Sequence, residues 1–296
     1  MNRKLTKQQI RETRAGYLFI LPNFLGFLTF TLFPVGFSLV LGFMNWNLTE
    51  YSFAGLQNFI TIFTKDELFF KVLKNTFYYM ILCIPPGFTL ALVLALALNR
   101  GLKGTIVFRA IFFLPVVISL IASSMIWAWI YNTDFGLLNY LLWKIFKVDS
   151  IQWLTDQRFA MPAVVMVALW HDTGYNITIM LAGLQTIPRQ LYEAADIDGA
   201  GGWYKFWKVT LPMLYPTLFF MTVMAIIGTF QVFDVIYALT GGGPMNSTRT
   251  YVAYLYSKGF NGFQFGYASA LAWIMFVIIF VFTFIQFKFQ RDDVMY

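Results

Sequence analysis

The chain has 296 residues, of which 59% are hydrophobic and only 12% are charged. An average soluble domain is about 25% charged, so a soluble protein of this composition could not cover its surface. The composition therefore predicts an integral membrane protein. The net charge of +7 does not indicate nucleic-acid binding, because the basic residues are spread through short loops. A single cysteine and a single histidine exclude a disulfide framework and a usual zinc site.

Six segments are long and apolar enough to predict an all-α fold of transmembrane helices. They cover about residues 17–45, 75–98, 108–131, 159–184, 214–239 and 266–288. Pro22 and Pro34 predict a kink or an interfacial portion in the first span. Pro85 and Pro86 remove two consecutive amide donors from the second span. The sixth span opens with small residues that favour close helix packing, namely Gly266, Ala268, Ala270 and Ala272.

Basic residues set the expected orientation. The N-terminal tail and the loop after the second span carry Arg3, Lys4, Lys7, Arg11, Arg14, Arg100, Lys103 and Arg109. Loops rich in lysine and arginine stay in the cytoplasm, so six spans place both termini there. The expected divisions are a cytoplasmic tail at 1–16, a first helix with an external amphipathic segment at 17–74, a membrane core at 75–290 and a cytoplasmic tail at 291–296.

Two external segments have recognisable patterns. Large apolar residues recur at helical spacing in 55–76, which predicts an amphipathic helix on the membrane surface; they are Leu56, Phe59, Ile60, Phe63 and Phe70. The stretch TGGGPMNS at 240–247 combines three glycines with a proline and predicts a helix stop.

The polar segment LYEAADIDGAGGWYKFWKVTLPML at 191–214 lies between the fourth and fifth apolar spans. Pro188 can start a helix over 188–198, because a proline in the first turn lacks only a donor that has no helical partner. Gly199, Gly201 and Gly202 are expected to end it. A second short helix at 203–211 is expected to stop near Pro212. The pattern predicts a cytoplasmic helical hairpin; an ordinary interfacial helix is the alternative.

The segment also carries a specific motif. Glu193-Ala194-Ala195, Asp198-Gly199-Ala200 and Leu211-Pro212 together resemble the EAA loop in permease subunits of binding-protein-dependent ABC importers. Other stretches resemble the sugar-transporting branch of that family: GLQNF at 55–59, LPVVIS at 114–119 and LAGLQTIPRQLY at 181–192. LTGGGPMNST at 239–248 and FGYASALAW at 265–273 are similar to its maltose-type first permease.

The resemblance implies the type I importer fold and a role for the loop at 185–213. In that family the loop docks into a cleft of a separate ATPase and carries its closing motion to the transmembrane helices. The residues to which the resemblance gives this coupling role are Glu193, Ala194, Ala195, Asp198, Gly199, Leu211 and Pro212.

The resemblance also implies partners. These are a second permease in a heterodimer, two ABC ATPase subunits, an extracytoplasmic sugar-binding protein and membrane lipid, in a bacterial or archaeal cytoplasmic membrane. The sequence has no Gly-rich loop ending in Gly-Lys-Ser/Thr, which would cradle ATP phosphates. We therefore expect no cofactor on this chain, and ATP with Mg²⁺ on the partner ATPase.

Polar residues within a span are costly in lipid, so they indicate function. In the fourth span, polar side chains share an arc of about 160°: His171, Asp172, Tyr175, Asn176 and Thr178. Carboxylates and amides bond sugar hydroxyls, and rings cover the apolar faces of pyranoses. With the neighbouring Trp170, this face is a candidate substrate pathway. The alternative is helix packing, with His171 and Asp172 bonded only to each other.

The fifth span adds Gln231 and Asp234, three residues apart and so on one side of a helix, and more weakly Thr229. Asp234 lies near the Gly-rich stop, so an external vestibule is the alternative place for it. Neither span contains Lys or Arg. A neutral mono- or oligosaccharide is therefore favoured over the alternative substrates, glycerol-3-phosphate and other polyol phosphates.

Two further classes compete with an importer subunit. In a proton-coupled secondary transporter, His171, Asp172 and Asp234 would relay protons. Six helices are few for a self-contained transporter, and its cytoplasmic hairpin would have no role. A membrane enzyme is disfavoured because no metal set or nucleophile–base pair is visible, so the chain is expected not to be an enzyme.

Overall fold

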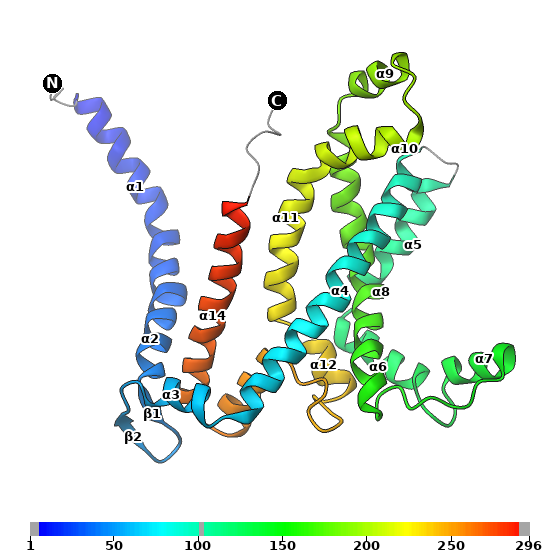
Figure 1. Ribbon diagram of the computed structural model, residues 1–296. Helices are drawn as coiled ribbons and strands as arrows, with labels where there is room; N and C mark the ends of the chain where they lie inside the picture. Colours follow the sequence, from blue (N-terminus) through cyan, green and yellow to red (C-terminus); the bar gives the residue numbers. More distant parts are fainter. Residues whose placement is uncertain (1–5, 101–103, 290–296) are drawn as a thin grey trace. The chain divides into compact units, whose positions relative to one another are not determined.

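The structure, a computed structural model, describes residues 6–100 and 104–289 (Figure 1). The expected tail at 291–296, and Arg3, Lys4 and Lys103 of the orientation argument, lie outside the described residues. The chain forms two compact units: unit 1 is Met1–Lys65 with Ser257–Ile274, and unit 2 is Asp66–Tyr256 with Met275–Tyr296. The last long helix contributes residues to both units. The expected divisions at 16/17, 74/75 and 290/291 stay predictions.

Unit 1 begins with α1 (Lys7–Phe27), the π-helical turn η1 (Leu28–Leu32) and α2 (Phe33–Gly42). The turn η1 lies between Pro22 and Pro34, while the kink or interfacial portion predicted from these prolines stays a prediction. A π-helical turn shifts the backbone bonds by one residue, which accommodates a local irregularity without ending the helix.

A β-hairpin follows, which the sequence analysis did not predict. Strands β1 (Met44–Trp46) and β2 (Tyr51–Phe53) pair antiparallel, with Trp46 opposite Tyr51. Asn47 Oδ1 accepts hydrogen bonds from the amides of Thr49 and Glu50, at 2.9 and 2.7 Å. This side-chain turn brings the two short strands together.

The amphipathic segment forms two helices rather than one. Helix α3 (Gln57–Thr64) is separated from α4 (Glu67–Asn99) by Asp66, whose Oδ1 accepts hydrogen bonds from two amides of the first α4 turn. Aspartate at this position satisfies amides that have no intrahelical partner, so a new helix starts there. Phe70 therefore belongs to α4, which begins before the predicted boundary at residue 75.

Small residues let the first part of α14 (Phe265–Lys288) approach its neighbours in unit 1, as predicted. A Cβ atom added to Gly266 would lie 1.8 Å from the carbonyl oxygen of Met44, and one added to Gly42 would lie 3.5 Å from the Ala270 amide. The π-helical turn η3 (Ser257–Asn261) precedes α14, and Gly259 lies against Ala268.

Unit 2 contains α4, which continues through Pro85 and Pro86, and two spans that differ from expectation. The predicted third span is a pair of helices, α5 (Thr105–Val117) and α6 (Leu120–Ile130), bent by 98°. The predicted fifth span is α11 (Leu211–Phe230), which stops before the short α12 (Asp234–Leu239). Further helices of unit 2 are α7 (Leu137–Phe146), α8 (Gln157–Gln185) and α13 (Tyr251–Tyr256).

Four helical segments of the described chain are long and apolar enough to cross a membrane: Arg11–Gly42, Glu67–Asn99, Gly202–Phe230 and Phe265–Lys288. The bent pair α5–α6 is a fifth if it counts as one span. Helix α8 has 29 residues but is not in this set. Its polar residues lower the apolar character of a helix that is otherwise long enough to span. The predicted number of six spans stays a prediction.

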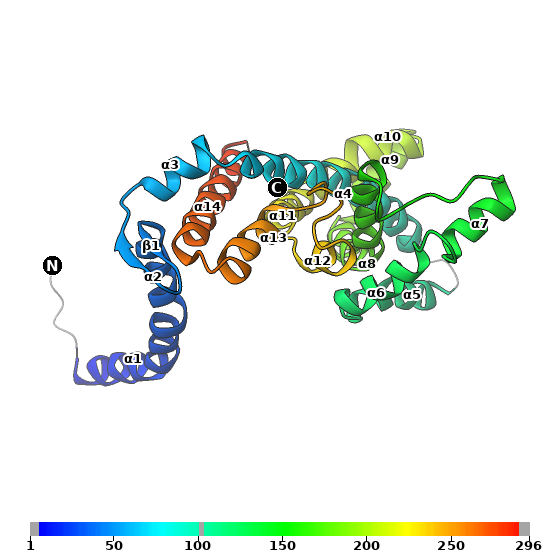
Figure 2. The same ribbon diagram turned by 90° about the horizontal axis from the view of Figure 1, so that it is seen from below.

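Helix α8 is the centre of unit 2, packing against α4, α5, α11 and α12. Two of its glycines allow this approach: a Cβ on Gly174 would lie 2.2 Å from the Phe112 carbonyl oxygen, and one on Gly183 would lie 2.5 Å from Thr217 Oγ1. One apolar cluster joins the first half of α8 to α12, and another joins its second half to α4 and α11. Figure 2 shows α12 beside α8.

Candidate functional site

The polar segment after α8 folds as the helix predicted for 188–198. Helix α9 (Arg189–Ile197) follows Pro188, and Gly199, two residues beyond its last residue, has a φ of +72°, which glycine adopts without strain. The Ala200 amide donates to the Ala195 carbonyl oxygen at 2.8 Å, which closes the helix end.

The second helix of the segment does not stop at Pro212. Helix α10 (Gly202–Lys205) and the π-helical turn η2 (Phe206–Thr210) run directly into α11. The Leu211 amide donates to the Phe206 carbonyl oxygen, five residues earlier. Pro212 sits in the first turn of α11, where its missing amide hydrogen and fixed φ are tolerated. The predicted stop near Pro212 is therefore wrong.

The predicted coupling residues fall into two groups. Glu193, Ala194, Ala195, Asp198 and Gly199 belong to α9 or its end, and no residue of α9 is buried. Leu211 and Pro212 instead open α11. Hydrogen bonds join α9 to α10 and η2, which lead into α11: the Tyr192 and Thr210 hydroxyls lie 3.0 Å apart, and Lys205 Nζ lies 2.6 Å from Asp196 Oδ1. These contacts tie α9 to the segment that leads into α11.

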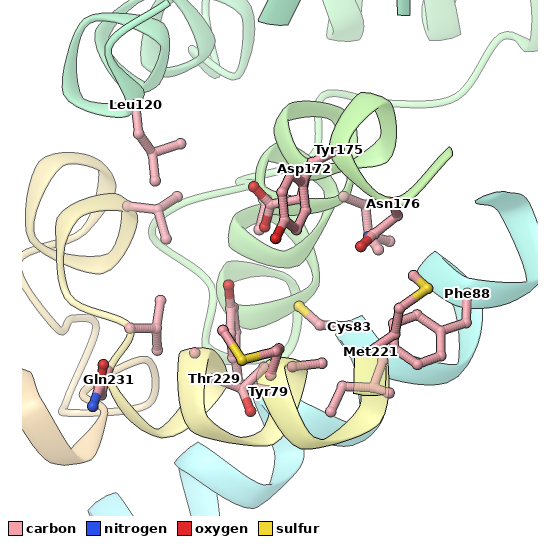
Figure 3. Close-up of a pocket in the computed structure, with 18 of the residues that line it drawn as sticks. Tyr79, Cys83, Phe88, Leu120, Asp172, Tyr175, Asn176, Met221, Thr229 and Gln231 are labelled. Carbon is pink, nitrogen blue, oxygen red and sulfur yellow. The ribbon is translucent and has the colours of Figure 1, made fainter. Parts of the chain in front are cut away.

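A cavity of about 390 Å³ lies within unit 2, lined by α4, α8, α11, α12, Leu120 of α6 and the break between α11 and α12 (Figure 3). Its polar side chains are Tyr79, Asp172, Tyr175, Asn176, Thr229, Gln231 and Asp234. None of the described residues that line it is Lys, Arg or His. The volume is within the range of small-molecule sites in proteins.

The polar face of α8 divides at the cavity edge. Asp172, Tyr175 and Asn176 line the cavity, and the Asp172 side chain is 61% exposed. His171 does not line it: Nδ1 lies 2.8 Å from Asp172 Oδ1, and Nε2 lies 3.3 Å from the Ile118 carbonyl oxygen at the α5–α6 bend. The His171–Asp172 contact expected in the packing alternative thus exists, while Asp172 still faces the cavity.

Two further residues of the predicted α8 face are held elsewhere. The Trp170 ring packs against Trp127 at 5.6 Å between centroids and is not part of the cavity lining. The Thr178 hydroxyl donates to the Gly174 carbonyl oxygen at 2.9 Å, within the helix.

The residues predicted in the fifth span line the cavity for a different reason. Gln231 follows the last residue of α11 and Asp234 is the first residue of α12, so they do not share one side of a continuous helix. The break itself forms the wall and brings both of them to the cavity. Thr229 also lines it, with its hydroxyl donating to the Ile226 carbonyl oxygen at 3.0 Å.

Several lining residues were not predicted, most of them from α4 and α11: Tyr79, Cys83, Phe88, Met221 and Met224. In Figure 3 the labelled residues of α4 and α11 face those of α8 across the cavity. One signal was present in the sequence: Gly87, directly after Pro85-Pro86, lies where an added Cβ would be 3.1 Å from Leu169. A glycine in a span marks such a close helix approach.

The cavity offers two carboxylates, two amides, hydroxyls and aromatic rings. The polar groups can accept hydrogen bonds from the hydroxyls of a ligand and donate hydrogen bonds to them. The aromatic rings can pack against the apolar faces of a ligand. With two carboxylates and no cation among the described lining residues, the cavity disfavours an anion, and its polar groups can bond a hydroxyl-rich molecule.

Comparisons with known proteins agree with this architecture. A family model described as "Binding-protein-dependent transport system inner membrane component" matches residues 68–292. The "Probable ABC transporter permease protein YesP" of Bacillus subtilis is 40% identical over 94% of this chain and 91% of its own length. The "Lactose transport system permease protein LacF" of Rhizobium radiobacter is 36% identical over 94% of both chains.

A further relative and a solved structure are also similar to this chain. The "sn-glycerol-3-phosphate transport system permease protein UgpA" of Agrobacterium fabrum is 34% identical over 95% of this chain and 96% of its own. A chain from the crystal structure of a bacterial alginate ABC transporter, in complex with an alginate pentasaccharide-bound periplasmic protein, superposes with a TM-score of 0.85. That chain is 24% identical, with 97% of this chain and 98% of the other covered, and the likeness concerns the fold.

Proposed function

Because the chain belongs to the family of binding-protein-dependent transport system inner membrane components, we propose that it is the transmembrane permease subunit of an ABC importer for a sugar. The observation that carries this proposal is the cavity on α8, lined by hydroxyl-binding groups, on a helix that leads directly to α9. A related permease is named for lactose transport, which supports a sugar as the transported molecule.

A neutral mono- or oligosaccharide fits the cavity better than an anion. A phosphate group would meet Asp172 and Asp234 without a basic side chain among the described lining residues. Like charges at short range in a partly desolvated site repel strongly. Glycerol-3-phosphate remains the second candidate because a relative is named for its transport. A second permease would have to supply the cations for it.

The coupling path runs through side chains at the cytoplasmic end of unit 2. Ile187, between α8 and α9, is buried in the apolar cluster of α8, α4 and α11, and Tyr192 of α9 packs against that cluster. A separate ATPase that closes around α9 would therefore displace α8 and α11 together. Both helices line the cavity, so ATP-driven closure would change its access. Proteins convert such local docking into two discrete arrangements of packed helices.

The complete transporter in this proposal contains a second permease, two ABC ATPase subunits and an extracytoplasmic binding protein. This chain supplies one half of the transmembrane path, and ATP with Mg²⁺ acts on the ATPases. A proton-coupled transporter is less well supported, because α9, with no buried residue, would lack a function in it.

The proposal predicts ATP hydrolysis that depends on substrate delivery. The assembled complex in lipid nanodiscs should hydrolyse ATP several times faster with its binding protein and a neutral sugar than with either alone. Lactose and a panel of other neutral di- and oligosaccharides are the test ligands, with sn-glycerol-3-phosphate for comparison. Stimulation by sn-glycerol-3-phosphate alone would replace the sugar assignment. Uptake that collapses with the proton gradient while ATP remains would replace the importer mechanism.

The orientation gives a second prediction, motivated by the distribution of Lys and Arg. Reporter fusions after Arg100 and Gly201 should read cytoplasmic, and fusions after Ile60, Lys147 and Asn246 should read external. The Lys147 fusion decides whether the bent pair α5–α6 crosses the membrane. A cytoplasmic signal there would make the pair a re-entrant loop, and one at Asn246 would contradict the six-span topology.

A further inference from the structure

The non-helical break in the cavity wall leaves backbone groups to be satisfied. Helix α11 ends at Phe230 and α12 begins at Asp234, and all of 231–233 lines the cavity. Carbonyl groups at a helix end have no intrahelical donor, and in a membrane the surrounding protein must supply one. The donor therefore fixes the shape of this wall.

Thr250 supplies that donor for the middle residue of the break. Its Oγ1 hydroxyl donates to the Val232 carbonyl oxygen at 3.0 Å, and the Thr250 side chain is fully buried. Thr250 is 18 residues from Val232 in sequence and lies outside the cavity lining. Thr250 therefore contacts the cavity wall from the side that faces away from the cavity.

Thr250 ends a loop, residues 240–250, that is internally braced. Thr240 and Thr248 hydroxyl oxygens lie 2.7 Å apart, and the Thr248 hydroxyl also donates to the Gly243 carbonyl oxygen at 2.6 Å. Thr248 and Thr250 are fully buried. A loop held by its own side chains moves as one piece, so it can position what is attached to it.

The same loop is attached to α4, the opposite cavity wall. Asn75 Nδ2 donates to the carbonyl oxygens of Asn246 and Arg249, at 2.8 and 3.0 Å. Lys71 Nζ donates to the Met245 carbonyl oxygen at 2.7 Å. One turn further along α4, Tyr79 lines the cavity, followed by Cys83.

We propose that Thr250 and Asn75 are positioning residues for transport, because the loop 240–250 braces the α11–α12 break against α4 and so sets the width of the cavity. We call the loop 240–250, with its contacts to Val232 and Asn75, the brace. It lies beyond α12, at the end of α8 and α11 opposite to α9 (Figure 1). Neither residue lines the cavity. This inference rests on the proposed passage of substrate through the cavity.

Cys83 provides a reporter that needs no knowledge of the substrate. It is the single cysteine of the chain and it lines the cavity. We would measure its rate of modification by N-ethylmaleimide in the assembled transporter, resolving this chain by electrophoresis. A looser wall admits the reagent more often.

Four variants distinguish a specific effect on the position of the cavity wall from a general loosening of the fold. Thr250→Val is nearly isosteric but cannot donate, and Thr250→Ser keeps the hydroxyl. Asn75→Leu removes the α4 attachment. Thr222→Val is the matched control. The Thr222 hydroxyl donates to the Leu218 carbonyl oxygen within the same helix, α11, and Thr222 does not line the cavity.

Loss of one buried hydrogen bond should shift the equilibrium between the braced wall and a more open wall by about fivefold or more. Thr250→Val and Asn75→Leu should therefore speed Cys83 modification by about fivefold, while Thr250→Ser and Thr222→Val keep the wild-type rate. For sugar uptake, the first two should raise KM by a similar factor with a smaller change in maximal rate per assembled complex.

A wild-type rate of modification in Thr250→Val or Asn75→Leu would overturn the proposal. Equal acceleration in Thr222→Val or in Thr250→Ser would overturn it as well, because the effect would then be general loosening. Wild-type transporter that moves no sugar would contradict the proposed function but not the brace, which the labelling tests independently.

Discussion

Replacement of Asp172 by leucine is expected to reduce sugar uptake per assembled complex by at least about 10-fold, whereas Asp172→Asn keeps part of it. The Asp172 carboxylate lines the cavity and is 61% exposed there, so it is available to a ligand. An amide retains an acceptor and adds a donor for sugar hydroxyls, while an alkyl side chain has neither. An unpaired polar group in a closed site costs about 1–3 kcal/mol, or roughly 5- to 150-fold in affinity.

His171 makes this experiment sharper. Its Nδ1 loses the partner at 2.8 Å in Asp172→Leu, whereas the amide of Asp172→Asn can still form a hydrogen bond with it. His171→Gln therefore serves to separate the His171 contact from the ligand contact. Asp149→Leu, which removes an exposed carboxylate outside the cavity lining, is the control for charge alone.

Three outcomes are distinguishable by uptake per assembled complex. Partial activity in Asp172→Asn and loss in Asp172→Leu supports ligand contact. Equal loss in both, with uptake abolished by a proton uncoupler, supports a proton carrier instead. Full activity of Asp172→Leu would falsify the substrate contact.

Replacement of Gly199 by valine is expected to lower uptake by about 10-fold or more while the chain still inserts in the membrane. Gly199 has φ +72°, which costs a β-branched residue about 1–3 kcal/mol. The position is open, with no atom within 4 Å of an added Cβ, so the backbone and not a clash is responsible. The end of α9 must then rearrange, and the proposed ATPase contact with it.

Two substitutions test that reason. Asparagine adopts positive φ more readily, so Gly199→Asn should recover much of the uptake. Gly201 has extended backbone angles and equally open space, so Gly201→Val should leave the fold of α9 intact. The measurements are uptake and co-purification of the ATPase; a Gly199→Val chain with normal values of both would remove α9 from the coupling mechanism.

Glu193 tests the same surface by charge. It is exposed on α9 and forms no ion pair within the part of the chain that the structure describes. Glu193→Lys should weaken the ATPase contact, because a like charge opposite a complementary patch is repelled, whereas Glu193→Gln should have a smaller effect. Equal co-purification and uptake for both variants would place the contact elsewhere on α9.

Local features of the sequence determined much of the fold. Long apolar runs predicted the helices α4, α11 and α14, since only a helix satisfies its backbone inside lipid. Gly199 predicted the end of α9, because glycine lacks a Cβ atom and so adopts the positive φ of a helix end without strain. The EAA-type motif indicated the family because its residues are close together in sequence and can be recognised without the fold.

Errors arose where a single residue changes the backbone over a short range. Asp66 starts α4 by capping its first amides, which the apolar pattern of the segment concealed. Pro212 was expected to stop a helix, but η2 and the first turn of α11 accommodate it. Proline excludes a backbone hydrogen bond, and whether that ends a helix depends on its position in the turn.

The cavity was decided by tertiary structure. The bend at Ile118 and the break at Val232 interrupt runs that are apolar enough on average to predict one continuous span each, so hydropathy does not reveal them. The Ile118 carbonyl oxygen lies 3.3 Å from His171 Nε2, and the Val232 carbonyl oxygen accepts from the Thr250 hydroxyl; these side chains are 53 and 18 residues away in sequence. Sequence alone identified Asp172 and Gln231 as polar residues in apolar surroundings. Only the packing of α4, α8 and α11 brought them to one cavity, because a broken helix is stable in a membrane only where other segments satisfy its free backbone groups.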